Sequence, residues 1–219
     1  MKKYTETLKK CTLFNGIEPD NLEALLGCLN TKISEYKKGE TIIAEGAKAR
    51  YIGIVLKGSA QIMQIDYYGN KSILSSAKPS QIFAEAFACA EAEAMPVTVE
   101  ALEDCEIMLA DCNRILKTCC NSCTFHQQLI FNLMKELAKK TIVLHRKIDI
   151  ISKRTTRDKL MTYLLSEAKK QGKNIFEIPF DRQALADFLE VDRSGLSAEI
   201  SKLKNEGIIE SKKNRFKIL

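Results

Sequence analysis

The chain has 219 residues, of which 45% are hydrophobic and 28% are charged, a composition typical of a folded globular protein rather than a disordered one. No stretch approaches the roughly 18 consecutive apolar residues of a membrane span, and the first residues lead into no apolar segment, so we expect a cytoplasmic protein without a membrane partner. The net charge is +6, and residues 153–219 hold 15 basic against 10 acidic residues, which favours a polyanionic partner for this last third unless the basicity only aids solubility.

The first segment, residues 5–30, is expected to form short helices. Its apolar residues recur at rough spacings of three and four, and Pro19 marks a helix start. Cys28 continues the helical pattern of Leu25 and Leu26, so we expect its thiol to be buried as a small hydrophobic group.

The pattern changes between residues 32 and 111 to short β-rich runs separated by turn residues. Glycine-containing turns such as Lys57-Gly58-Ser59 separate the runs, and Cys105 is expected to be buried in one of them. Many short strands at this spacing favour a small antiparallel barrel, roll or sandwich. The expected strands are residues 41–43, 51–56, 59–65, 72–74, 97–99 and 106–109.

A long helix is predicted from about residue 122 to 152, where the sequence has neither glycine nor proline. Its apolar residues follow alternating spacings of four and three, which is the pattern of a coiled-coil seam. So long a seam in so small a protein needs another surface to bury it, so we expect dimerisation; the alternative is a helix packed on its own domain. The seam residues are Ile130, Met134, Leu137, Thr141, Leu144, Ile148 and Ile151.

The last segment, residues 153–219, is predicted to be a compact helical domain. Thr155 or Thr156 is expected to cap a first helix that runs to about Lys170, and a short strand follows at residues 176–179.

Two further helices with a tight break between them are predicted at residues 181–189 and 193–204. Asp181 and Asp192 are their expected N-caps, and the apolar residues of the second helix recur at spacings of four and three, so they face inward. Residues 210–219 then form a basic β-turn-β. This is the layout of a helix-turn-helix followed by a wing.

A helix pair of this kind suits the major groove of DNA, where residues near the start of the second helix touch base edges. Arg193 can bind a guanine bidentately, and the small Ser194 and Gly195 allow close approach. Basic residues around the pair and in the wing are expected to contact phosphates. The alternative is a helix pair that only packs on a protein partner. The candidate DNA contacts are Arg182, Gln183, Arg193, Ser194, Gly195, Ser197, Ser201, Lys202, Lys212, Lys213 and Arg215.

Short motifs follow one another in a consistent order and spacing along nearly the whole chain. They are Lys38-Gly39-Glu40, Glu45-Gly46, the stretch from Gly53 to Gly58, Gly69-Asn70, the stretch from Ile82 to Glu85, the long helix and the segment from Ile178 to Ile209. In this order the chain resembles the Crp/Fnr superfamily of bacterial transcription regulators.

The resemblance implies an α+β fold with an N-terminal antiparallel β-roll of the cyclic-nucleotide-binding type, a long dimerisation helix and a C-terminal winged helix-turn-helix. It also implies a parallel homodimer on a palindromic DNA operator. RNA polymerase is expected as a further partner. The implied parts are an effector-sensing roll with N-terminal helices at 1–121, the dimerisation helix at 122–152 and the DNA-binding domain at 153–219.

The segment that captures a cyclic nucleotide departs from the family pattern. Nucleotide-binding members carry Gly-Glu-Leu and, about ten residues later, Arg-Ser, whose arginine neutralises the phosphate. The corresponding residues here are Ala84-Glu85-Ala86 and Met95-Pro96. Because a buried phosphate without a cation is costly, we predict that cAMP and cGMP are not the effectors. The candidate residues of an effector pocket are Phe83, Ala84, Glu85, Phe87, Met95, Pro96, Leu144 and His145.

The cysteines leave a redox or metal role open. The oxygen-sensing branch of the family ligates an iron–sulfur cluster with an N-terminal cysteine group, but only Cys11 and Cys28 precede the roll here. Cys119, Cys120 and Cys123 could serve a different cluster, a metal or a redox switch. Adjacent cysteines fit no common metal spacing, so packing is the alternative, and no metal is assigned.

The sequence therefore predicts a sequence-specific DNA-binding regulator in which an unidentified small-molecule or redox effector resets the spacing of two recognition helices. No cofactor is identified. One alternative is a haem or iron–sulfur gas sensor of the same fold, with His145 as a haem ligand or else a plain surface histidine. Another is a dimeric scaffold that does not bind DNA. We expect no enzyme, because no catalytic set or phosphate-binding loop is found.

Overall fold

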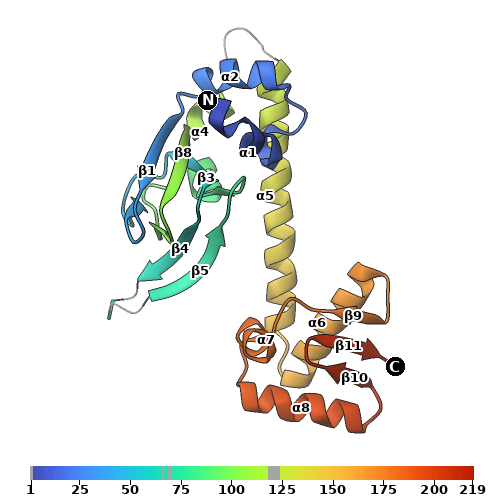
Figure 1. Ribbon diagram of the computed structural model, residues 1–219. Helices are drawn as coiled ribbons and strands as arrows, with labels where there is room; N and C mark the ends of the chain where they lie inside the picture. Colours follow the sequence, from blue (N-terminus) through green and yellow to red (C-terminus); the bar gives the residue numbers. More distant parts are fainter. Residues whose placement is uncertain (1, 66, 69–70, 118–123) are drawn as a thin grey trace. The chain divides into compact units, whose positions relative to one another are not determined.

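The computed structural model describes residues 2–65, 67–68, 71–117 and 124–219. The chain forms two compact units, Met1–Lys139 and Lys140–Leu219. The boundary falls inside helix α5 (Thr124–Ile151), so residues 124–139 of this helix belong to the first unit and residues 140–151 to the second (Figure 1). None of the helices in the described ranges has the length and apolar character that a membrane span requires.

Short helices open the first unit and pack on the first half of α5. Asn132 of α5 fixes this packing, because its side-chain amide donates to the carbonyl oxygens of Leu13 (3.0 Å) and Asn15 (2.8 Å). Leu129 and Leu133 of α5 share a buried apolar cluster with the leucines of these helices. The helices are η1 (Lys2–Tyr4), α1 (Thr5–Lys10), η2 (Thr12–Phe14) and α2 (Pro19–Cys28).

Cys28 is exposed, so the prediction that its thiol is buried is wrong. Leu25 and Leu26 are buried as expected, and the next buried side chain on this side is Leu29. Each helical residue is turned by about 100° from the last, so the position after Cys28 rather than Cys28 itself faces the core. Cys105, by contrast, is buried as predicted.

Two four-stranded antiparallel sheets form the β-roll within the described residues. Their strand orders are β1-β8-β3-β6 and β2-β7-β4-β5, so strands far apart in the sequence lie side by side. The expected strands are all present within a few residues, whereas β1 and β6 were not among them. The bounds are β1 (Lys32–Tyr36), β2 (Thr41–Ile43), β3 (Tyr51–Lys57), β4 (Ala60–Ile65), β5 (Lys71–Ala77), β6 (Ile82–Phe83), β7 (Thr98–Ala101) and β8 (Cys105–Asp111).

The turn between β3 and β4 requires glycine. Gly58 has a φ of +73°, a conformation that side chains disfavour, and an added Cβ would lie 2.6 Å from the carbonyl oxygen of Asp104. The roll therefore closes tightly at this corner. Two short helices complete the unit, α3 (Glu85–Cys89) after β6 and α4 (Cys112–Leu116) after β8.

The second unit packs three helices on a small three-stranded sheet of order β10-β11-β9 (Figure 1). Thr155 is the N-cap of its first helix and accepts a hydrogen bond from the backbone N–H of Asp158 at 3.0 Å. Of the two predicted caps, Thr155 and Thr156, the first is therefore the one observed. Asp181 and Asp192 cap the next two helices as predicted. The bounds are α6 (Thr156–Gln171), β9 (Ile175–Glu177), α7 (Arg182–Leu189), α8 (Arg193–Asn205), β10 (Ile209–Lys212) and β11 (Arg215–Ile218).

One apolar core holds the second unit together. Ile150 of α5, Leu164 of α6, Leu196 of α8 and Phe216 of β11 are all buried in the same cluster. The sequence prediction of an α+β chain with an antiparallel roll, a long helix and a winged helix-turn-helix is confirmed.

Candidate nucleic-acid interface and effector site

Helix α8 begins at a well-formed cap. The Asp192 carboxylate accepts hydrogen bonds from the backbone N–H of Gly195 (2.9 Å) and from the hydroxyl of Ser194. The Ser194 hydroxyl, followed by the backbone N–H of Gly195, lowers the pKa of Asp192 below its ordinary value. Leu196, Ile200 and other apolar residues of α8 are buried, so its register leaves one face of the helix toward solvent.

That solvent-facing side carries the residues that the sequence proposes for base contacts. The Arg193 side chain is exposed, and its guanidinium makes no hydrogen bond or ion pair with the described residues. The hydroxyl of Ser197 donates to the Arg193 carbonyl oxygen (2.9 Å), and that of Ser201 donates to the Ser197 carbonyl oxygen (3.0 Å), which leaves both hydroxyl oxygens free to accept. A Cβ on Gly195 would approach only one Asp192 oxygen, at 3.9 Å. The exposed residues of this face are Arg193, Ser194, Gly195, Ser197, Ser201 and Lys202.

Helix α7 places its two candidate residues differently. Gln183 is exposed, and its amide donates to the Asp187 carboxylate at 2.8 Å. Arg182 is half-buried, with its guanidinium carbon 6.0 Å from the centre of the Phe216 ring. Burial lowers the pKa of Arg182, and one of its terminal nitrogens is buried without a hydrogen bond from the described residues. Arg182 is therefore held against β11 rather than extended into solvent.

The hairpin β10–β11 presents the basic wing. Lys212, Lys213 and Arg215 are exposed, and Lys213 adopts a positive φ of 54° at the turn. The side-chain amide of Asn214 donates to the Ile178 carbonyl oxygen at 3.2 Å and fixes the base of the hairpin. The wing thus carries three cations on a fixed turn.

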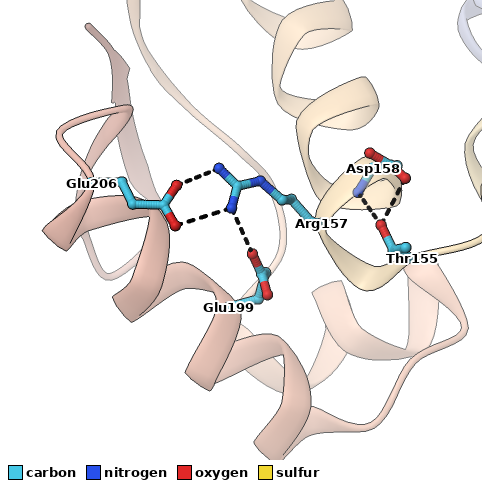
Figure 2. Close-up of polar contacts among 5 residues, drawn as sticks. All are labelled: Thr155, Arg157, Asp158, Glu199 and Glu206. Carbon is cyan, nitrogen blue, oxygen red and sulfur yellow. Dashed lines mark hydrogen bonds and ion pairs between the residues drawn. The ribbon is translucent and has the colours of Figure 1, made fainter.

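An ion-pair cluster that the sequence did not reveal ties α6 to the second half of α8. Figure 2 shows the Arg157 guanidinium between Glu199 and Glu206, with one nitrogen 3.1 Å from a Glu206 oxygen. The second terminal nitrogen of the guanidinium bonds the other Glu206 oxygen. The first nitrogen also lies 3.7 Å from a carboxylate oxygen of Glu199. The hydrogen bond to Arg157 lowers the pKa of Glu206 and raises that of Arg157. Only the fold could show this, since 49 residues separate Arg157 from Glu206.

The last turns of α5 hold α7 within the second unit. The Lys147 ammonium donates to the Phe188 carbonyl oxygen and lies 4.3 Å from the centre of the Phe188 ring. It also lies 3.7 Å from the Glu190 carboxylate. Lys147 therefore connects the long helix to the end of the first helix of the pair.

The effector candidates of the roll lie mostly in its interior. Met95 is 2% exposed and shares one apolar cluster with Phe83 and Ala84. Glu85 is buried beside them, Phe87 is half-buried and Pro96 is exposed. A Cβ on Gly53 would lie 2.0 Å from the Phe83 ring, so Phe83 fills the space above β3. A separate cavity of about 440 Å³ is lined by Arg50, Asp111, His126 and others, and none of the candidates lines it.

The remaining candidates lie on α5. Leu144 and His145 belong to the second unit, and both are exposed. Of the predicted seam, Met134, Leu144 and Ile148 are 55%, 60% and 57% exposed, and Thr141 is exposed as well. The other three seam residues, Ile130, Leu137 and Ile151, are half-buried.

The metal and haem candidates receive limited support. Cys119, Cys120 and Cys123 lie outside the described residues. Within the described ranges no group of three histidine, cysteine or acidic residues is placed to hold a metal ion. The haem candidate His145 is exposed, and a ring nitrogen of the buried His126 lies 2.7 Å from the Arg114 carbonyl oxygen.

Comparison with known families assigns both halves of the chain. A model of the cyclic nucleotide-binding domain matches residues 33–120, and a model of the Crp-like helix-turn-helix domain matches residues 158–219. Together they cover well over half of the sequence. The chain belongs to the Crp/Fnr superfamily. It is a DNA-binding transcription regulator, and its helix-turn-helix is the element formed by α7 and α8.

Solved structures share the Crp/Fnr fold along nearly the whole chain. The catabolite activator protein of Thermus thermophilus is 20% identical, with a TM-score of 0.57 over 95% of this chain and 93% of its own. The c-di-GMP responsive regulator CLP of Xanthomonas campestris is 15% identical, with a TM-score of 0.57 over 92% and 99%. DNR of Pseudomonas aeruginosa is 22% identical, with a TM-score of 0.52 over 100% and 95%. A comparison with curated protein sequences finds no match.

The backbone at Ala84, the residue before α3, is left-handed, with a φ of +62°. A left-handed conformation costs a residue with a side chain about 1–2 kcal/mol. The turn into α3 therefore keeps the conformation that suits glycine without the residue that favours it.

Proposed function

We propose that this Crp/Fnr regulator binds a palindromic operator as a homodimer and is gated by an effector other than cAMP or cGMP. The observation that carries the proposal is the outward face of α8, where the Arg193 guanidinium has no partner among the described residues and small polar side chains surround it. Arg193 reads a base, Ser194 and Ser197 lie within the groove, and the wing cations contact phosphates.

Homodimer formation is supported by the unburied seam of α5. Met134, Leu144 and Ile148 expose more than half of their side-chain surface on one helix. A second copy of α5 would remove this apolar surface from water, as knobs pack into holes in a coiled coil. Two copies of α8 would then meet half-sites about one helical turn apart.

The seam is tested with Ile148→Glu, which places a charge at a predicted contact. We expect sedimentation velocity to show monomers at concentrations where the parent chain is dimeric, with unchanged circular dichroism because Ile148 is exposed. Val143→Glu is the matched control, since Val143 is 63% exposed on the same helix but outside the seam. Equal dissociation by both variants, or by neither, contradicts the proposed seam.

Gating without a cyclic nucleotide is supported by the interior of the roll. The resemblance to nucleotide-binding members matches Met95 to their phosphate-binding arginine. Met95 is buried with Phe83 and Ala84. Burying a phosphate there without a cation would be costly. The proposed effector is therefore a small apolar molecule or a redox signal.

The role of Arg193 is tested on an operator selected from random duplexes with the full-length chain. Arg193→Ala should weaken binding to that operator by about 1–3 kcal/mol in fluorescence anisotropy and relax one base position. Lys173→Ala, which also removes one cation from the second unit but is not a proposed contact, should leave the affinity unchanged. Lys213→Ala should reduce the slope of log K against log salt by about one.

Three results contradict these assignments. Equal losses of affinity for Arg193→Ala and Lys173→Ala would assign Arg193 no specific contact. A rise in operator affinity on adding cAMP would overturn the exclusion of cyclic nucleotides. Failure to select any duplex, with no salt-dependent affinity, would instead favour the dimeric scaffold.

A further inference from the structure

Two cysteine thiols of the first unit face each other across the end of the roll. Cys89 is the last residue of α3 and Cys112 is the first residue of α4. Their sulfur atoms lie 3.5 Å apart although 23 positions separate them in the sequence. Within the described residues no other pair of thiols lies within hydrogen-bonding distance.

The surroundings of the two thiols are unequal. Cys112 is 2% exposed, whereas Cys89 is partly exposed to solvent. The hydrogen bond between the two thiols lowers the pKa of Cys89, which burial and the Glu85 carboxylate oppose, and it raises the pKa of Cys112. Cys89 is the more accessible sulfur, as an attacking thiol must be, while Cys112 is the protected second thiol.

We propose that Cys89 and Cys112 form a two-electron oxidation site that a hydroperoxide converts into a disulfide. The Cys89 thiolate attacks the distal peroxide oxygen, the O–O bond breaks, and the departing oxygen leaves as an alcohol or water after taking up a proton. Cys89 is then a sulfenic acid. The Cys112 sulfur attacks the Cys89 sulfur, the S–O bond breaks, and water leaves with the Cys112 proton. The two thiols have lost two electrons, and the peroxide has gained them.

The bond requires little movement. A disulfide holds its sulfurs about 2.05 Å apart, so the two sulfurs must approach by about 1.5 Å. A dithiol reductant restores both thiols by exchange and becomes oxidised itself. Cys89 ends the helix that begins at the effector candidate Glu85 and follows Phe83 and Ala84, so oxidation would tie that helix to α4.

Peptide mapping of the full-length chain tests the site. The reduced protein is treated with hydrogen peroxide, its free thiols are blocked with N-ethylmaleimide, and it is cleaved after glutamate, lysine and arginine. This cleavage separates the cysteines, since Cys89 falls in the peptide 86–91, Cys105 in 104–106 and Cys112 in 107–114. We expect peptide 86–91 bonded to 107–114, with a mass two hydrogens below the sum of the two reduced peptides, and its loss after dithiothreitol.

Single substitutions separate this site from the other cysteines. Cys112→Ala should abolish the cross-linked peptide and leave Cys89 as a sulfenic acid that dimedone traps. Cys28→Ser is the matched control, because Cys28 is exposed and outside the pair, and it should leave the cross-link unchanged. The proposal is overturned if peroxide-treated parent protein still carries maleimide on both Cys89 and Cys112, or if either sulfur is bonded mainly to another cysteine.

Discussion

The helix-turn-helix and the β-roll use their functional residues in opposite ways. The candidate contacts of α8 lie within residues 193–202, and each of these six candidates is exposed. The candidates of the roll come from residues 83–96, and Phe83, Ala84, Glu85 and Met95 are buried. A surface that displays charge needs only a helix in the correct register. A ligand cavity needs space, and side chains from distant strands determine whether space remains.

The largest effect that separates the two units is expected from Phe216→Ala. Phe216 is 1% exposed in the core of the second unit, and such truncations cost about 3–5 kcal/mol. Hydrogen exchange measured by mass spectrometry should show lost protection in residues 140–219, with the roll unchanged. Leu219→Ala, at an exposed position after the same strand, is the control and should change little. Equal loss of protection in the roll would show that the two units unfold as one.

A smaller effect, confined to the roll, is expected from Gly53→Ala. The new Cβ would lie 2.0 Å from the Phe83 ring, and overpacking of this kind costs about 1–3 kcal/mol. Adding Phe83→Leu should recover part of the lost unfolding free energy, measured by urea denaturation followed by circular dichroism. Gly27→Ala is the matched control, because its Cβ would meet nothing within 4 Å. If Gly53→Ala is as harmless as Gly27→Ala, the interior beside Phe83 is open enough to admit a ligand.

The smallest effect is expected from Arg157→Ala, which removes the ion pairs of Figure 2. Exposed ion pairs contribute little, so we expect a small drop in the melting temperature of the second unit at pH 7, which added salt reduces. Because the folded state lowers the pKa of Glu206, this contribution is present above the ordinary carboxyl value of about 4.3 and is lost as pH falls through the lowered value. A difference from the parent chain that persists unchanged at pH 2 would assign Arg157 a packing role instead. Arg157→Lys keeps the positive charge but removes the planar guanidinium, so its melting temperature separates the contribution of the charge from that of the paired hydrogen bonds.

The elements with strong local signals were predictable. Asp181 and Asp192 cap helices whose apolar residues follow the helical repeat, so α7 and α8 could be placed within a residue or two. Strands β3 and β4 are likewise marked by β-branched residues around the Gly58 turn. The exposed face of α8 follows directly from this register, which is why most candidate DNA contacts lie on the surface as expected.

Features that depend on distant residues could not be predicted. Strand β6 has two residues, too few for a periodic pattern, and its position is set by pairing with Gly53 and Ile54 of β3. The contact of Arg157 with Glu206 and the approach of Cys89 to Cys112 join separate segments. Arg182 looks like a phosphate contact in the sequence, yet it lies partly buried against Phe216. Sequence periodicity says which face is apolar but not which side chains meet there.

If two copies pair through the exposed residues of α5, the output of this regulator depends on how many copies the cell holds. If the operator-binding form consists of two chains, then well below the dissociation constant of the pair its concentration rises with the square of the total protein. Halving the number of copies would then cut operator occupancy about fourfold at low occupancy, before any effector is present. Synthesis and degradation of the chain would therefore act as an input of their own.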